Sequence, residues 1–142
     1  MSLGLIALIP ALLSPSLTPG PASIMYGQWR VVSSRCPGIC AMSTNESAQW
    51  NGKMARYSAS VARFDADSCA APSYASHLLT AGAFSDAHRV SLKSLGITAD
   101  SVTVVEVGCN GKWWAPGSLI IIKDQAHIFT LWDGVFFEMV RV

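Results

Sequence analysis

Residues 101–142 read SVTVVEVGCNGKWWAPGSLIIIKDQAHIFTLWDGVFFEMVRV, and this stretch decides the fold class. It is rich in Val, Ile and aromatic residues, which are enriched in strands. Asn110-Gly111 and Asp133-Gly134 are two-residue hairpin signals between apolar runs. Pro116-Gly117 is a further turn signal. We therefore expect an antiparallel meander with strands at residues 101–109, 118–123, 126–132 and 135–142.

The first half of the chain gives weaker signals of the same kind. Residues 26–32 (YGQWRVV) favour a first strand. Ser43 and Glu46 have the spacing of a capping box, which predicts a short helix that Asn51-Gly52 ends. Residues 53–64 alternate roughly between apolar and polar side chains, which fits one or two strands.

Residues 65–100 are the least regular part of the sequence. Short strands or a turn of helix both fit residues 77–84. Gly96 follows residues 91–95 and is expected to form a turn or a helix C-cap. No further element is predicted there.

A meander of at least six or seven strands must protect its two edges. Closing the sheet into a barrel does so, and a two-sheet sandwich is the alternative. The spacing of strand signals, about 8–12 residues, suits either arrangement.

The composition limits the possible functions. The chain has 142 residues, of which 51% are hydrophobic and 13% charged, which fits one globular domain and excludes disorder. Ten basic and nine acidic residues give a net charge of +1. Because there is no excess of cations to neutralise phosphates, we expect no nucleic-acid partner.

The N-terminus has the pattern of a secretory signal peptide. Residues 3–13 are an apolar run too short for a stable membrane span, and a Pro-rich stretch follows, ending in small residues at Ala22-Ser23. No Lys or Arg precedes the run, and an apolar segment packed on the domain is the alternative. Four prolines disfavour a packed helix or strand there. We therefore assign residues 1–23 to a signal peptide and 24–142 to the domain, in the periplasm or outside the cell.

Four cysteines, Cys36, Cys40, Cys69 and Cys109, fit an oxidising compartment. Four cysteines allow three pairings. The segment CPGIC closes a short loop through a Pro-Gly turn, which favours Cys36–Cys40 and leaves Cys69 with Cys109. A zinc site is less favoured, because the spacing is CxxxC and the three histidines are scattered.

Gly27, Trp29 and Arg141 carry a family resemblance. A G-x-W in the first strand and an Arg in the last resemble the pattern of calycins, the lipocalins and their bacterial relatives. The resemblance implies an all-β, antiparallel up-and-down β-barrel, here with one short helix after the first strand. It also implies that Trp29 closes the floor of the barrel and that Arg141 lies over it. No other lipocalin motif is present, so no lipocalin ligand is implied.

The sequence shows no catalytic or cofactor motif. It lacks G-x-S-x-G, G-x-G-x-x-G and the P-loop. His88 and His127 are interpreted as surface or structural residues, and Glu106 and Glu138 as outward-facing strand residues. We therefore expect a protein that is not an enzyme and has no metal or cofactor.

Trp113 and Trp114 are the best binding signal. Adjacent strand residues point to opposite faces, so one ring is expected in the core and the other at the surface or a cavity mouth. An exposed Trp beside a loop often marks a recognition site. The alternative is that Trp114 packs under the Pro116-Gly117 turn.

Together these features predict an exported, non-catalytic binding protein that holds a small apolar ligand or an envelope or extracellular protein. The alternative is an exported inhibitor of a hydrolase such as lysozyme or a protease. It would act through the Cys36–Cys40 loop or through residues 110–116. A wide apolar interior would favour a small ligand, whereas a filled interior with a protruding rigid loop would favour inhibition.

Overall fold

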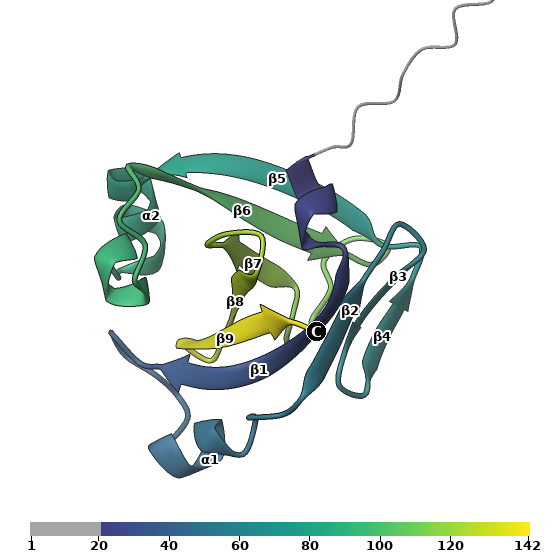
Figure 1. Ribbon diagram of the computed structural model, residues 1–142, viewed down its shortest axis with the longest axis horizontal. Coiled ribbons are helices and arrows are strands. Elements are labelled where there is room, and N and C mark those ends of the chain that lie inside the picture. Colours follow the sequence, from purple (N-terminus) through teal and green to yellow (C-terminus); the bar gives the residue numbers. More distant parts are fainter. Residues whose placement is uncertain (1–20) are drawn as a thin grey trace, which may run out of the picture.

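The computed structural model describes residues 21–142 (Figure 1). Nine antiparallel strands form one curled sheet, a half-barrel. The strands are Gly27–Arg35 (β1), Met54–Tyr57 (β2), Val61–Phe64 (β3), Asp67–Ala70 (β4), Ser73–Thr80 (β5), Ser101–Gly108 (β6), Leu119–Ile122 (β7), His127–Trp132 (β8) and Val135–Arg141 (β9). The helices are Thr44–Ala48 (α1) and Ala81–His88 (α2), with 3-10 turns at Pro21–Met25 (η1) and Leu92–Leu95 (η2). Residues 1–20 of the predicted signal peptide lie outside the described residues.

The strand order is β4-β3-β2-β1-β9-β8-β7-β6-β5, so the first and last strands of the chain are neighbours, as an up-and-down barrel requires. The expected closure is incomplete, because β4 and β5 form the two ends of the sheet and do not pair. Since every paired neighbour is antiparallel, β4 and β5 run in the same direction. They are joined by Ala71, which has a positive φ of 51°, and Pro72, which has no N–H for a ladder. The chain therefore bends here and does not form a hairpin.

Side chains connect the two ends of the sheet. A disulfide joins Cys69 on β4 to Cys109, the residue directly after β6. The Tyr74 hydroxyl on β5 donates to the carbonyl oxygen of Ser58 at 2.7 Å, in the turn between β2 and β3. The Tyr74 ring also packs against Tyr26 at a centroid distance of 5.4 Å. These contacts hold the curl where backbone pairing is missing.

The inside of the curl is filled with side chains. Eight of the nine strands supply buried residues to one apolar cluster. Its largest members include Trp29, Tyr57, Phe64 and Phe137, each at most 1% exposed. The half-barrel therefore encloses a packed core.

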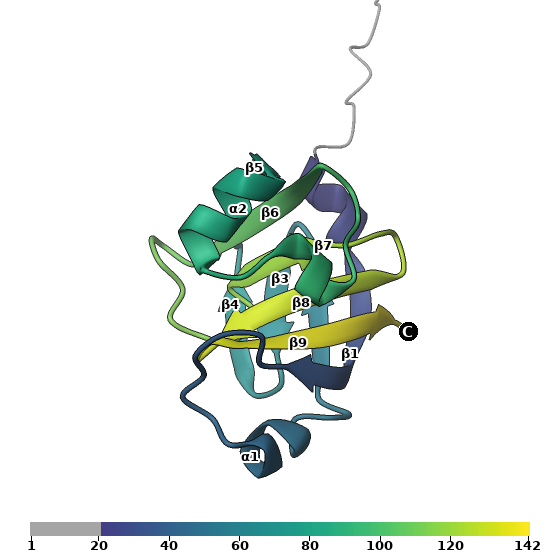
Figure 2. The ribbon, with the colours of Figure 1, turned by 90° about the vertical axis from the view of Figure 1, so that its left-hand side faces the viewer.

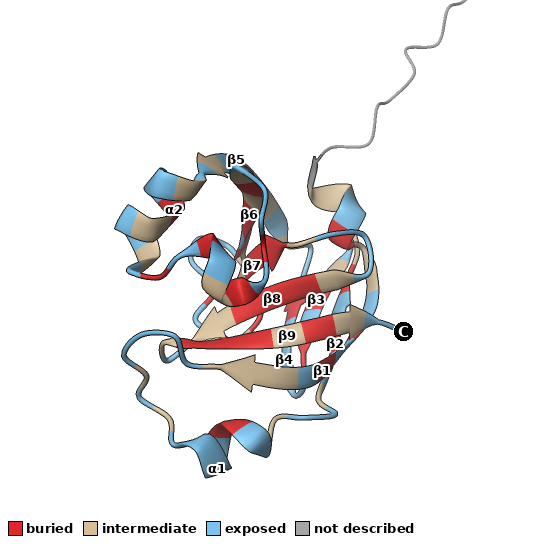
Figure 3. Cartoon of the chain, turned by 60° about the vertical axis from the view of Figure 1, so that its left-hand side comes forward, coloured by how far each residue is buried: buried red, intermediate tan, exposed pale blue. Residues whose placement is uncertain are grey.

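A second core lies outside the curl, where α2 and η2 pack against β6–β9 (Figure 2). Phe84 of α2 and Leu95 of η2 are fully buried there, against residues such as Phe129. Buried residues consequently run along β8 and β9 (Figure 3). The expectation of a single short helix was thus wrong, because α2 covers an outer face that would otherwise be apolar.

The predicted helix after the first strand is present as α1. The Ser43 hydroxyl accepts from the Glu46 N–H at 3.1 Å, and the Ser43 N–H donates to the Glu46 carboxylate at 2.8 Å. This reciprocal pair is the capping box that the sequence predicted.

The expected hairpin at Asn110-Gly111 is only partly formed. Both residues have positive φ, 52° and 112°, as a tight turn requires. Beyond it the ladder is a single bridge between Gly108 and Lys112, and β7 begins only at Leu119. Residues 109–118 are therefore a loop.

Within residues 21–142, no helix has both the length and the apolar character needed to cross a membrane.

Candidate functional site

The end of the 109–118 loop is fixed by Gly117, which has a φ of 85°. Its N–H donates to the Thr130 hydroxyl at 3.0 Å, and its carbonyl oxygen accepts from the Tyr57 hydroxyl at 2.8 Å. A Cβ on Gly117 would lie 2.6 Å from the Tyr57 oxygen and 2.9 Å from Cβ of Phe64. This position therefore excludes a side chain and holds the loop against the core.

Trp113 and Trp114 point in opposite directions from this loop. Trp113 is 9% exposed and belongs to the inner core, whereas Trp114 is 77% exposed. The Lys112 ammonium lies 4.0 Å from the centre of the Trp114 ring, in a cation–π contact. Trp114 does not pack under the Pro116-Gly117 turn, where Tyr57 occupies the space. Its role in binding remains a prediction.

Trp114 borders an open groove of about 600 Å³. We call it the tryptophan groove; its walls come from β5, β6, the start of β7, the end of β8 and the 109–118 loop. The lining residues are Ser73, Ala75, Glu106, Val107, Gly108, Gly111, Lys112, Trp113, Trp114, Ser118, Leu119, Leu131 and Trp132.

The groove is lined from both sides of the sheet, because Val107 and Trp113 belong to the inner core whereas other lining residues belong to the outer face. Leu119 and Leu131 pack against the outer core and also line the groove. Trp132 adds a third indole, which sequence reasoning placed only in a strand. The sequence feature that could have identified Trp132 as a groove residue is its position directly before the Asp133-Gly134 turn.

Two charged residues, Glu106 and Lys112, line the groove. Glu106 points outward, as expected, and its carboxylate lies 3.8 Å from the His77 imidazole. Both side chains are more than half exposed. Within residues 21–142 no hydroxyl or thiol is hydrogen-bonded to a histidine. The other close histidine–acid pair joins Asp124, in the turn between β7 and β8, to His127, the first residue of β8.

Glu138 also points outward, but its side chain is only 13% exposed. Its carboxylate lies 3.5 Å from the Arg35 guanidinium and 4.0 Å from the Lys123 ammonium, and it accepts from the Ser33 hydroxyl at 3.2 Å. Arg35 also donates to the carbonyl oxygen of Ser94 in η2 at 3.1 Å. The network therefore fastens η2 to the sheet.

The four cysteines form two disulfides, Cys36–Cys40 and Cys69–Cys109, which is the expected pairing. No group of three or more His, Cys, Asp or Glu side chains in residues 21–142 is placed to hold a metal ion.

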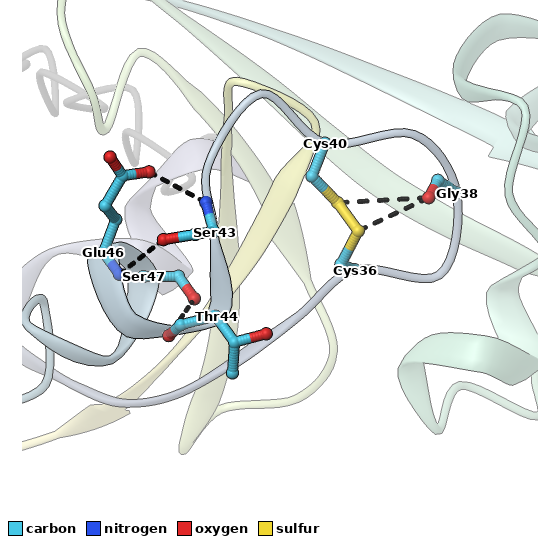
Figure 4. Close-up of a disulfide and its surroundings, with 7 residues drawn as sticks. All are labelled: Cys36, Gly38, Cys40, Ser43, Thr44, Glu46 and Ser47. Atoms are coloured by element: carbon cyan, nitrogen blue, oxygen red, sulfur yellow. Dashed lines mark hydrogen bonds between the residues drawn. A yellow bond between two sulfur atoms is a disulfide. The ribbon is translucent and has the colours of Figure 1, made fainter.

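The Cys36–Cys40 loop is a second candidate surface (Figure 4). The N–H of Ala41 donates to the carbonyl oxygen of Asp133 at 2.8 Å. A Cβ on Gly134 would collide with the carbonyl oxygen of Ile39, so the loop rests directly on the β8–β9 turn. Ile39 is 98% exposed. The loop therefore presents one aliphatic side chain from a cross-linked support.

The two residues predicted to close the barrel floor lie in contact. The Arg141 guanidinium lies 4.3 Å from the centre of the Trp29 ring. It donates to the carbonyl oxygens of Tyr26 and Ile24, both at 2.6 Å, and of Gln125 at 2.9 Å.

Comparisons of the chain with protein-family models, with curated proteins and with solved structures give no match.

Proposed function

We propose that this protein is an exported, non-catalytic binding protein that holds a partner protein in the tryptophan groove. The observation that carries the proposal is the position of Trp114, 77% exposed on a loop that Gly117 anchors to the core. A large aromatic side chain on a rigid support loses little conformational entropy on binding. Such residues dominate the energy of protein interfaces.

The packed interior favours a partner protein over a small apolar ligand held inside the barrel. A ligand there would have to displace fully buried side chains such as Trp29 and Tyr57. The groove, in contrast, is open and combines apolar walls with the polar side chains of Ser73, Ser118 and Glu106. This mixture suits one or two side chains of a partner.

Export and family membership are parts of the same proposal. The apolar run and small residues within residues 1–23, together with two disulfides, support a periplasmic or secreted protein. The pairing of β1 with β9 and the contact between Trp29 and Arg141 support a calycin-like family. Intact-mass analysis of the exported protein tests the first point, because a chain that retains residues 1–22 would exclude a cleaved signal.

Inhibition of a hydrolase is the second candidate, and Ile39 favours it. An aliphatic side chain that is 98% exposed on a disulfide-closed loop is suited to enter an apolar pocket of an enzyme. In this alternative Ile39, and not Trp114, is the anchor.

One experiment distinguishes the two surfaces. The mature protein is used to capture partners from its native envelope or medium, alongside the variants Trp114→Ala, Ile39→Ser and Leu78→Ala. Leu78 is 74% exposed on β5 and is the matched control for loss of an exposed apolar side chain.

We expect Trp114→Ala to lower recovery of the partner at least about tenfold, the effect of losing one interface anchor, while Leu78→Ala does not. Loss with Ile39→Ser alone would support the inhibitor instead. Equal recovery with Trp114→Ala and the unchanged protein would refute the groove as the binding site.

A further inference from the structure

The outer face of β1, β2 and β3 carries three arginines, Arg30, Arg56 and Arg63, one on each strand. All three are exposed. Their strand neighbours Trp29 and Ala55 point inward and are buried, so the alternation places the arginines on the outside. We call this surface the arginine face.

Strand register brings the guanidinium groups together. Arg56 lies directly opposite Arg63 in the β2–β3 ladder. Arg30 is opposite Met54, two residues from Arg56, which makes Arg30 and Arg56 diagonal neighbours. Like charges directly opposite each other destabilise a sheet, so this arrangement does not serve the fold.

The acidic groups nearby do not neutralise this charge. Asp65 pairs with Lys53 at 3.0 Å, and Arg63 donates only to the backbone carbonyl oxygen of Asp65, at 2.8 Å. Within residues 21–142, Arg30 and Arg56 have no carboxylate at ion-pair distance. Among the described residues, the face therefore carries three arginines that no carboxylate pairs, in a chain whose net charge is only +1.

Apolar groups lie among these cations. Met54 is 40% exposed between the arginines, and Val32, further along β1, is 42% exposed. Met54, Arg56 and Arg63 also line a shallow hollow of about 400 Å³. The surface is thus both cationic and locally apolar.

We propose that the arginine face docks the protein onto a membrane surface of anionic phospholipids. Guanidinium groups bind phosphate oxygens in a bidentate manner, and each cation near an anionic leaflet contributes attraction. Met54 can enter the headgroup region, where an apolar side chain is stabilised. A soluble polyanion would gain nothing from Met54. This inference does not rest on the proposed function, because the tryptophan groove is built on β5–β8.

The test is co-sedimentation with lipid vesicles. The full mature protein is mixed with phosphatidylcholine vesicles or with vesicles that also contain phosphatidylglycerol. We expect binding to the anionic vesicles only, weakening as salt concentration rises. Each of Arg30→Gln, Arg56→Gln and Arg63→Gln should weaken binding about fivefold, the equivalent of ~1 kcal/mol per cation.

Lys93→Gln is the matched control, because it removes one positive charge from η2, away from this face. Equal weakening by Lys93→Gln would overturn the proposal, since it would indicate attraction by net charge alone. Met54→Ser should weaken vesicle binding but leave binding to dextran sulfate unchanged. Binding to dextran sulfate without binding to anionic vesicles would identify a soluble polyanion instead. Trp114→Ala should leave vesicle binding unchanged, which separates this result from the test of the groove.

Discussion

The guanidinium group of Arg141 lies 4.3 Å from the centre of the Trp29 ring, although the two residues are at opposite ends of the domain. The pairing of β1 with β9 brings them together, with Trp29 directly opposite Arg141 in the ladder. The guanidinium also donates to three backbone carbonyl groups, two of them in or just after η1. Arg141 therefore fastens the start of the described chain to its last strand.

Replacing Arg141 with Ala should lower the free energy of unfolding by roughly 1–2 kcal/mol, because the cation–π contact and its hydrogen bonds are lost. Arg141→Lys should recover only part of this loss, since an ammonium group cannot stack flat on the indole or reach three carbonyls. Urea unfolding measures both values. Arg30→Ala is the control, because Arg30 is exposed and makes no ion pair within residues 21–142. Full stability in Arg141→Lys would contradict this account.

The two disulfides should differ in their contribution to stability. Cys69 and Cys109 are 40 residues apart in sequence, whereas Cys36 and Cys40 are four apart. A longer closed loop restricts the unfolded chain more. Removing the Cys69–Cys109 bridge should therefore cost about 4 kcal/mol, and removing the Cys36–Cys40 bridge about 2 kcal/mol. Double replacement by Ala, followed by urea unfolding without reductant, tests this order. A larger cost for the Cys36–Cys40 pair would be inconsistent with it.

Stability should fall at high pH through Tyr74. Burial, and to a smaller extent the neighbouring Tyr26, raises the pKa of Tyr74 to about 12. The unfolded chain ionises at a pKa of about 10, so between these values the folded state holds a proton that the unfolded state has lost. This contribution is complete below about pH 10 and is lost as the pH rises towards about 12.

Burial also raises the pKa of Tyr57, so the pH dependence of stability in the unchanged protein contains contributions from both Tyr57 and Tyr74. The difference between it and Tyr74→Phe isolates Tyr74. We expect the free energy of unfolding to fall less steeply above about pH 10 in Tyr74→Phe. Parallel pH profiles of the two proteins would show that Tyr74 ionises normally.

Local signals in the sequence predicted much of this fold. The turn residues Asn110-Gly111 and Asp133-Gly134 adopt the positive φ values that their residue types favour. The capping box at Ser43 formed because it depends only on residues three apart. The distant pair Trp29 and Arg141 was identified through the calycin resemblance.

The missed features depend on contacts between distant segments. Helix α2 is short, and its burial of Phe84 depends on the outer face of β6–β9. A sign that the outer face is covered was present in β7, where the adjacent residues Ile120 and Ile121 are both fully buried. Such a strand must be covered on both faces. The tryptophan groove and the arginine face depend on strand register, which alternation alone does not determine.

Trp113 and Trp114 provide the sharpest test of the candidate site, because neighbouring residues of one type differ only in their surroundings. Trp113 is 9% exposed in the inner core, so Trp113→Ala should lower the free energy of unfolding by about 3–5 kcal/mol. Trp114 is 77% exposed, so Trp114→Ala should change it by no more than about 0.5 kcal/mol.

Urea unfolding of the two variants measures this difference. The capture experiment can be interpreted only if the Trp114→Ala protein is stable and folded. Any loss of the partner then reflects the missing indole at the groove and not a damaged fold. If Trp114→Ala instead unfolds as easily as Trp113→Ala, Trp114 is part of the core. The tryptophan groove would then lose the exposed anchor on which its proposed binding role depends.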